Sequence, residues 1–331
     1  MRKAAGQTTS VRGRPGLIFW LVMLPLGIAC VACIVLPLVG RSGSLGRVLD
    51  LFSHFELQYL LAAIAATIGF ALMQRWGWMG VGLAGVVLNT LFVAPWYFGR
   101  SGEATDAPRV LRLMLVNVWV NNAHHDRVID LIRDERPDVV ILQEINRRWL
   151  ASLSTIEDDY PFQARSPNAR HYGDVIYSRV PMVEQYLTTT SYGNPSVMSV
   201  ELDVGEPITL VSMHPPPPMS QRLHSMYRQM YDAAVRHLQN ADGPRLFAGD
   251  MNCSMWGASY RRLVRETDMH DARQGFGVLP SWPTHSPLMR TAIDHVLHDA
   301  QFQVLNCRLG PNVGSDHRPV IVDFALSPAR H

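Results

Sequence analysis

The side chains best suited to chemistry in this 331-residue chain are acidic, amide and imidazole groups at the ends of short apolar segments. Asp250 and Asn252 directly follow the apolar run 246–248, and Gly249 before them is expected to allow a tight turn. Glu144 ends another apolar run in the same way. Short apolar runs bounded by turn residues are typical of buried strands, so these groups should meet where the strands end.

Five further polar residues occupy strand ends or interrupt an apolar strand: Asn117, His214, Asp294, Asp316 and His317. Carboxylate and amide oxygens suit a hard divalent cation, Mg²⁺ or Mn²⁺, and the sequence has no cluster of cysteine and histidine with zinc spacing. Imidazole titrates near neutrality, as a general acid or base must. A carboxylate such as Asp294 within an apolar strand needs a partner, which a histidine would supply.

The first hundred residues differ from the rest in composition, because they contain three apolar segments of about 17–39, 52–73 and 77–98. Each is long enough to cross a bilayer, and tryptophan and tyrosine flank the third as in an aromatic belt. The first segment is too long for a signal peptide, and no polar mature chain follows it. We therefore predict three transmembrane helices in residues 1–103 and a separate domain in residues 104–331. Asn89 is expected to make a hydrogen bond between helices.

The charge distribution predicts the orientation in the membrane. The N-terminal tail carries four basic residues, Arg2, Lys3, Arg12 and Arg14, and the loops between the apolar segments carry fewer. This excess predicts a cytoplasmic N-terminus and, after three spans, a C-terminal domain outside the cell membrane. Residues 104–331 hold 22 arginines and 25 acidic residues, a net charge of −3 without lysine, which does not indicate a strong sequence-independent grip on nucleic acid.

The domain after residue 104 has many strand-like runs and few helices. The expected strands are 110–118, 139–142, 175–177, 199–204, 208–214, 246–248, 292–297, 302–309 and 319–324, and the expected helices are 126–135, 220–238 and 260–266. This pattern predicts an α+β fold in which two packed sheets are covered outside by helices. Four cysteines are too few for a disulfide scaffold, and whether Cys253 and Cys307 pair is left open by the sequence.

Taken together, these segments resemble the endonuclease/exonuclease/phosphatase superfamily of DNase-I-like metallophosphoesterases. The resemblance covers about residues 109–326 and rests on LVNVW, ILQE, GDVIYSRVP, VSMHP, GDMN, IDHVL and SDHRPV, which occur in the order of the family. It implies a four-layer α/β/β/α sandwich, here preceded by the three transmembrane helices. Asp174 departs from the pattern, because the family often has asparagine or a small residue at that position.

The resemblance also implies roles for the residues of the site. The metal ligands would be Glu144, Asn117 and Asp316. Asp250 would orient or deprotonate the attacking water, and Asn252 would contact the phosphate. His317, paired with Asp294, would act as acid/base or phosphate ligand, and His214 would be the second active-site histidine. Other histidines, among them His295, are expected to be structural or exposed.

Three functions fit the sequence. The first is a membrane-anchored, Mg²⁺-dependent phosphoesterase that hydrolyses a phosphate ester or anhydride by in-line attack of water. The second is a degenerate domain that binds a phosphorylated lipid without turnover, and the third is a membrane-anchored assembly protein. The joint presence of Asp250 and His317 favours the enzyme. Three spans and the short linker 101–108 would hold the site near the bilayer, which favours a phosphorylated lipid over nucleic acid, with a DNase-like nuclease as the alternative. The sequence indicates no protein partner.

Overall fold

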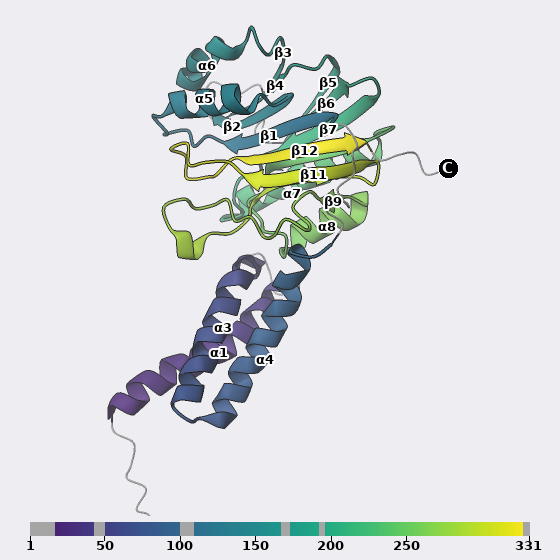
Figure 1. The fold of residues 1–331 in the computed structure, drawn as a ribbon. Helices are drawn as coiled ribbons and strands as arrows, with labels where there is room; N and C mark the ends of the chain where they lie inside the picture. The colour runs from purple at the N-terminus through teal and green to yellow at the C-terminus, as the bar shows by residue number, and fades with distance from the viewer. Residues whose placement is uncertain (1–16, 43–49, 100–108, 167–172, 192–195, 327–331) are drawn as a thin grey trace, which may run out of the picture.

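The computed structural model describes residues 17–42, 50–99, 109–166, 173–191 and 196–326. The basic N-terminal tail and the linker 101–108, on which the predicted orientation and domain boundary depend, lie outside these ranges. Figure 1 shows three long helices forming a bundle, and an α/β body standing on one end of it.

The bundle consists of α1 (Leu17–Ser42), α3 (Glu56–Leu72) and α4 (Trp76–Val93). The 3-10 turn η1 (Leu51–Phe55) leads into α3, and η2 (Ala94–Trp96) continues α4. Three segments, Leu21–Gly40, Leu51–Leu72 and Trp76–Trp96, are long and apolar enough to cross a membrane. Their positions match the three apolar segments predicted from the sequence.

Small residues and one amide hold the helices together. A Cβ at Gly82 would lie 2.5 Å from Thr67 Oγ1, so glycine is what allows α4 to approach α3 so closely. Asn89 Nδ2 donates to the carbonyl of Cys33 in α1 at 2.9 Å, which confirms the predicted hydrogen bond between helices. Large apolar side chains such as Leu91 point outward and are exposed, as a lipid-facing surface requires.

The body contains two six-stranded sheets with the strand orders β11-β12-β1-β2-β4-β3 and β5-β6-β7-β8-β10-β9. Their strands are β1 (Leu111–Asn117), β2 (Val139–Ile145), β3 (Phe162–Arg165), β4 (Gly173–Ser178), β5 (Met182–Thr189), β6 (Ser196–Asp203), β7 (Pro207–Met213), β8 (Arg245–Asp250), β9 (His270–Asp271), β10 (Asp294–His298), β11 (Phe302–Leu309) and β12 (Val320–Leu326). Each sheet has one parallel pair at its centre, β1–β2 and β7–β8, between antiparallel neighbours. The two parallel pairs therefore end near each other and bring their polar residues to one side of the body.

Three apolar cores separate four layers. The core between the sheets includes Leu113, Ile141 and Leu246, whose side chains come from the central strands of both sheets. A second core lies between the first sheet and α5 (His125–Glu135) with α6 (Arg147–Leu153). A third lies between the second sheet and α7 (Gln221–Gln239) with α8 (Ala258–Thr267). The predicted α/β/β/α sandwich behind three apolar helices is confirmed.

Some features of the fold were not predicted. The strands β3, β5 and β9 and the helix α6 were not predicted from the sequence. β5 is an edge strand with exposed apolar residues such as Val183, so it lacks a clear alternation. Cys253 and Cys307 are both buried free thiols in different cores, one under α7 and α8 and one between the sheets. The question left open by the sequence is thereby answered, because these two residues form no disulfide.

The helical bundle is joined to the body by direct contacts. The carbonyl of Trp96, at the end of η2, accepts hydrogen bonds from Gly275 N at 3.0 Å and Gly277 N at 2.9 Å. The indole of Trp256 donates to the carbonyl of Phe92 in α4 at 3.1 Å. Val93 belongs to the same apolar core as the residues beneath α7 and α8. The orientation of the body on the helices is therefore fixed by packing as well as by the chain connection.

Candidate active site

A β-bulge places Glu144 at the end of β2. The pairing of β2 with β4 shifts register between Leu142 and Ile145, and Glu144 has a left-handed backbone with φ of 64°. In a regular strand, neighbouring side chains face opposite sides of the sheet. Here the side chains of Gln143 and Glu144 both make hydrogen bonds at the ends of the parallel strands. Gln143 is buried, and its side chain donates to Met213 O at 3.0 Å and accepts from Asp250 N at 2.8 Å. The bulge thus changes the direction of the Glu144 side chain, and the hydrogen bonds of Gln143 join the two parallel strand pairs.

Asn117 connects the acidic groups of the two sheets. Its Nδ2 donates to Glu144 Oε1 at 3.0 Å and to Asp250 Oδ2 at 3.1 Å. Glu144 Oε2 accepts from Val120 N at 3.1 Å. Asp250 is 1% exposed, so its carboxylate is held in a largely desolvated position. The structure therefore brings Asn117, Glu144 and Asp250 into one hydrogen-bonded cluster.

Asn252 lies beside this cluster in a left-handed conformation, with φ of 47°. Its backbone N–H donates to Asp250 Oδ1 at 2.8 Å, and its side chain donates to Pro215 O at 3.0 Å. The expected role of Gly249 as a turn residue was wrong, because Gly249 is part of β8. A Cβ there would lie 2.0 Å from Met213 O, so glycine is required for the close approach of β7.

Two histidines flank the carboxylate of Asp250. His317 Nε2 and His214 Nε2 each lie 3.6 Å from Asp250 Oδ2. A second carboxylate stands behind each ring: His317 Nδ1 is 2.9 Å from Asp294 Oδ2, and His214 Nδ1 is 3.7 Å from Asp174 Oδ1. The structure thus brings together the expected pair of Asp294 and His317. Asp174 is the counterpart behind His214, a partnership that was not predicted from the sequence.

The surrounding charges set the protonation of these groups. Burial alone would lower the pKa of His317, but Asp294 and Asp250 outweigh it and raise that pKa to about 10. Burial is likewise outweighed for His214, where Asp174 and Asp250 raise the pKa to about 9. Burial raises the pKa of Asp250 to about 6, against the opposing charge of His317. At neutral pH this arrangement favours two protonated imidazoles on either side of an ionised carboxylate, which suits the recognition of a phosphate group.

Residues of the loop after β9 support the pair of Asp294 and His317. Ser281 Oγ donates to Asp294 Oδ2 at 2.5 Å, and the indole of Trp282 donates to Asp316 Oδ2 at 3.2 Å. Neither Ser281 nor Trp282 was predicted, because they lie in an irregular loop without periodicity. Asp174 did carry a signal, since it is a carboxylate in the apolar strand β4, the same argument that identified Asp294.

The oxygen donors fit a divalent cation. Glu144, Asp250 and the amide of Asn117 converge at the strand ends, and Asp316 Oδ1 is buried with no hydrogen-bond partner within the described parts of the chain. Ligand atoms of Asp250, Asp294 and His317 also lie within 4.8 Å of one another. Asp316 contacts Trp282 and lies next to His317 in sequence, on the Asp294 side of the site. Buried carboxylates with an unsatisfied oxygen are the donor chemistry that Mg²⁺ and Mn²⁺ prefer.

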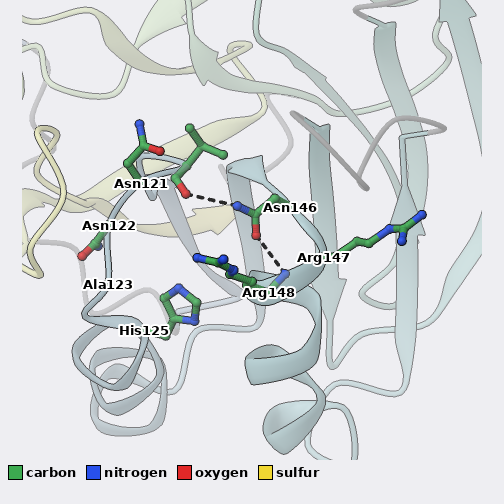
Figure 2. A pocket seen from close by; sticks show the side chains of 8 residues that line it. Asn121, Asn122, Ala123, His125, Asn146, Arg147 and Arg148 are labelled. Atoms are coloured by element: carbon green, nitrogen blue, oxygen red, sulfur yellow. Dashed lines mark hydrogen bonds between the residues drawn. The ribbon is translucent and has the colours of Figure 1, made fainter.

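A polar pocket (Figure 2) is lined in part by Val120, whose backbone N–H donates to Glu144 Oε2. Its lining comes from the segment after β1, the first residue of α5 and the start of α6: Val120, Asn121, Asn122, Ala123, His125, Asn146, Arg147 and Arg148. Asn146 holds these segments together, because its Nδ2 donates to Val120 O at 3.1 Å and its Oδ1 accepts from Arg148 N at 2.9 Å. In Figure 2 the side chain of Arg148 extends along the pocket, whereas that of Arg147 points away from it. Amides and a guanidinium at this place can accept a polar or anionic part of a substrate.

The model of the Endonuclease/Exonuclease/phosphatase family matches residues 114–317, a stretch that contains every residue of this site from Asn117 to His317. This chain belongs to the endonuclease/exonuclease/phosphatase family. As a member, it is a metal-dependent phosphoric-ester hydrolase of the phosphodiesterase, nuclease or phosphatase kind. No curated protein sequence matches the chain.

Solved structures of the family share the fold. An endonuclease/exonuclease/phosphatase from Beutenbergia cavernae is 20% identical with a TM-score of 0.53, covering 66% of this chain and 72% of that one. The D. rerio protein TDP2, complexed with a single-strand DNA product, is 19% identical with a TM-score of 0.55, covering 65% and 98%. The 3' phosphatase NExo from Neisseria, bound to a product DNA hairpin, is 17% identical with a TM-score of 0.54, covering 65% and 99%. Each alignment covers about two thirds of this chain, roughly the share that the α/β body takes up.

Proposed function

We propose that this family member is a membrane-anchored, Mg²⁺-dependent phosphoesterase that hydrolyses a phosphorylated lipid at the surface of the cell membrane. The observation that carries the proposal is the contact between the body and the apolar helices. Trp96 O and Phe92 O, at the end of the third apolar segment, accept hydrogen bonds from the body, and Val93 packs into its core. An active site anchored in this way meets lipid-borne substrates at a high effective concentration, an advantage that a soluble polymer does not share.

The residues of the site divide the work of hydrolysis. A bound Mg²⁺, held by Glu144, Asn117 and Asp316, would act as a Lewis acid toward the phosphate oxygens. Asp250, ionised at neutral pH, orients a water molecule and accepts its proton. His317, held by Asp294, and His214 on the other side of Asp250 donate hydrogen bonds to the phosphate oxygens as negative charge develops. The amide of Asn252 contacts the phosphate from the same side.

A DNase-like nuclease is the second candidate function. It is favoured by the solved relatives that contain DNA, TDP2 and NExo, and by the arginine that extends along the pocket of Figure 2. The charge of the domain argues against it, because residues 104–331 have a net charge of −3 and no lysine. Proteins that bind nucleic acid without sequence preference rely on cationic surface that displaces counterions.

A direct comparison of substrates tests the proposal. The full-length protein, reconstituted in liposomes, is given plasmid DNA, RNA or a polyprenyl pyrophosphate, with Mg²⁺, with Mn²⁺ or with chelator. We expect metal-dependent release of phosphate from the lipid and little nicking of the plasmid. Efficient nicking without lipid turnover would favour the nuclease instead. Glu144→Ala serves as the inactive control in both assays.

The proposed orientation has its own test. With a cytoplasmic N-terminus and three spans, the catalytic body lies outside the membrane. Protease added to intact spheroplasts should then remove the body, and the same digestion pattern should persist after lysis. Cleavage only after lysis would place the body in the cytoplasm and restrict the substrate to the inner leaflet.

A further inference from the structure

One loop of the active site carries an exposed apolar tip. We call residues 283–291 the lip; they contain the short turn η4 (Pro287–Met289). Leu288 is 79% exposed and Met289 is 48% exposed, and both lie on this turn. A single exposed apolar residue is ordinary, whereas here two large ones are adjacent at a loop tip and form a continuous apolar surface.

Hydrogen bonds hold the lip against the second apolar segment. Gln58 Nε2 donates to Arg290 O at 2.7 Å, and Thr291 Oγ1 donates to His54 O at 2.8 Å. Both Gln58 and His54 lie inside the apolar segment Leu51–Leu72. Leu288 is two residues from Arg290, so the chain keeps it within about 7 Å of that contact. Figure 1 shows the yellow-green turn beside the upper ends of the helices, on the side of the body that faces the bundle.

The other end of the lip is attached to the catalytic residues. Thr284 N donates to Asp316 O at 2.8 Å, and Thr284 Oγ1 donates to Ser315 O at 2.8 Å. The guanidinium of Arg290 donates to the carbonyls of Pro283 at 3.3 Å and Thr284 at 2.8 Å. These bonds tie both ends of the lip to each other and to the segment that holds Asp316. The lip is therefore a braced element between the second apolar segment and the site.

We propose that the lip inserts Leu288 and Met289 into the boundary between head groups and acyl chains, and guides the phosphate of a membrane lipid to Asp250 and His317. The occupant of this apolar surface is the bilayer itself, because the adjoining helix segment is apolar and the lip is hydrogen-bonded to it. The insertion rests on the position of the lip and on the apolar helices crossing the membrane. The guidance of a lipid also rests on the proposed function, so the two parts need separate measurements.

Insertion is tested by fluorescence quenching. Leu288→Cys is labelled with an environment-sensitive fluorophore, since the four native cysteines are all buried. The labelled full-length protein is reconstituted in phosphatidylethanolamine/phosphatidylglycerol vesicles that contain brominated lipids. Val183→Cys is the matched control, because Val183 is 60% exposed on β5, at the far edge of the second sheet. Strong quenching at 288 with none at 183 is expected. Equal, weak quenching at both positions would overturn insertion.

Guidance is tested by kinetics. The double variant Leu288→Ser/Met289→Ser is compared with wild type and with Val183→Ser, on a polyprenyl pyrophosphate in the same vesicles and on soluble bis-p-nitrophenyl phosphate. We expect KM for the vesicle substrate to rise by about tenfold, a free-energy change of about 1.4 kcal/mol, with the soluble substrate unaffected. An unchanged KM on vesicles would overturn guidance. If wild type hydrolyses only the soluble substrate, the proposed lipid substrate is wrong, and guidance is wrong with it. The quenching experiment would still decide whether the lip inserts.

Discussion

Asp294 and His295 are neighbours in β10, and each belongs to a buried pair of carboxylate and imidazole on opposite faces of the second sheet. Asp294 pairs with His317, whereas His295 Nδ1 lies 3.1 Å from Asp271 Oδ2. The ring of His295 has both nitrogens occupied, because its Nε2 donates to Cys253 O at 2.8 Å. His317 keeps Nε2 directed toward Asp250, 3.6 Å away and outside hydrogen-bond distance. One imidazole can therefore reach a substrate and the other cannot.

The charges around the two pairs differ as well. Burial lowers the pKa of His295, and the guanidinium of Arg273 adds to this effect. Arg273 Nε also lies 3.1 Å from Asp271 Oδ1, so the carboxylate of that pair is already neutralised. His317 instead faces the carboxylates of Asp294 and Asp250, which outweigh burial and raise its pKa to about 10. The same two residue types thus give a structural pair or a chemical one, depending on the third charge nearby.

Replacing each histidine by alanine should separate the two roles most clearly. His317→Ala should lower kcat by about 10²- to 10⁴-fold, since it removes a proton donor at the phosphate, and should leave the fold intact. His295→Ala should instead lower the melting temperature, with near-normal activity in the folded fraction. Phosphodiester hydrolysis and thermal unfolding are measured on both variants. A large loss of kcat in a fully folded His295→Ala protein would break the comparison.

A double-mutant cycle should test the chemical role of the pair of Asp294 and His317 more closely. If Asp294 acts by orienting His317, then Asp294→Ala and His317→Ala should be strongly non-additive, with the double variant about as slow as His317→Ala. The free energies from kcat/KM for wild type, both single variants and the double variant give the coupling. Effects that add would mean that Asp294 and His317 act independently.

Much of this site could be predicted because polar residues at the ends of apolar strands leave a clear pattern. Asn117, Glu144, Asp250 and the pair of Asp294 and His317 were all identified in that way, and the structure brings them together. The bulge at Glu144 could not be predicted, since it depends on how β2 pairs with β4, which only the folded sheet determines. The partners Ser281 and Trp282 were missed because an irregular loop has no period to detect.

The contact between the helices and the body also could not be predicted from the sequence. The apolar segments were predicted from their length and lack of charge, but the hydrogen bonds of Gln58 with Arg290 and of Trp256 with Phe92 join residues more than 150 positions apart. No local pattern encodes such pairs. Gly249 was assigned to a turn for the same reason. Its actual role depends on the backbone of β7, which is distant in sequence.

The smallest expected effect concerns the structural pair and its dependence on pH. Burial alone would raise the pKa of Asp271, but Arg273 and His295 outweigh it and lower that pKa to about 2 from the ordinary 3.8. The ionised carboxylate of Asp271, held mainly by Arg273 and also by His295, therefore adds on the order of 2 kcal/mol of stability above about pH 4, and this is lost as the pH falls through about 2. The difference in unfolding free energy between wild type and Asp271→Asn should shrink over that range. A difference that stays constant from pH 5 to pH 2 would contradict a stabilising ionised carboxylate at Asp271.

The most direct test of the account is the metal-dependent activity of Glu144→Ala. The purified full-length protein and the variant are compared on bis-p-nitrophenyl phosphate with Mg²⁺ and with chelator, alongside circular dichroism to establish folding. We predict turnover by wild type with Mg²⁺, its loss with chelator, and a folded variant whose rate falls by at least about 10³-fold, because one carboxylate of the cation site is gone. Near-normal hydrolysis by folded Glu144→Ala would contradict the assignment of the active site.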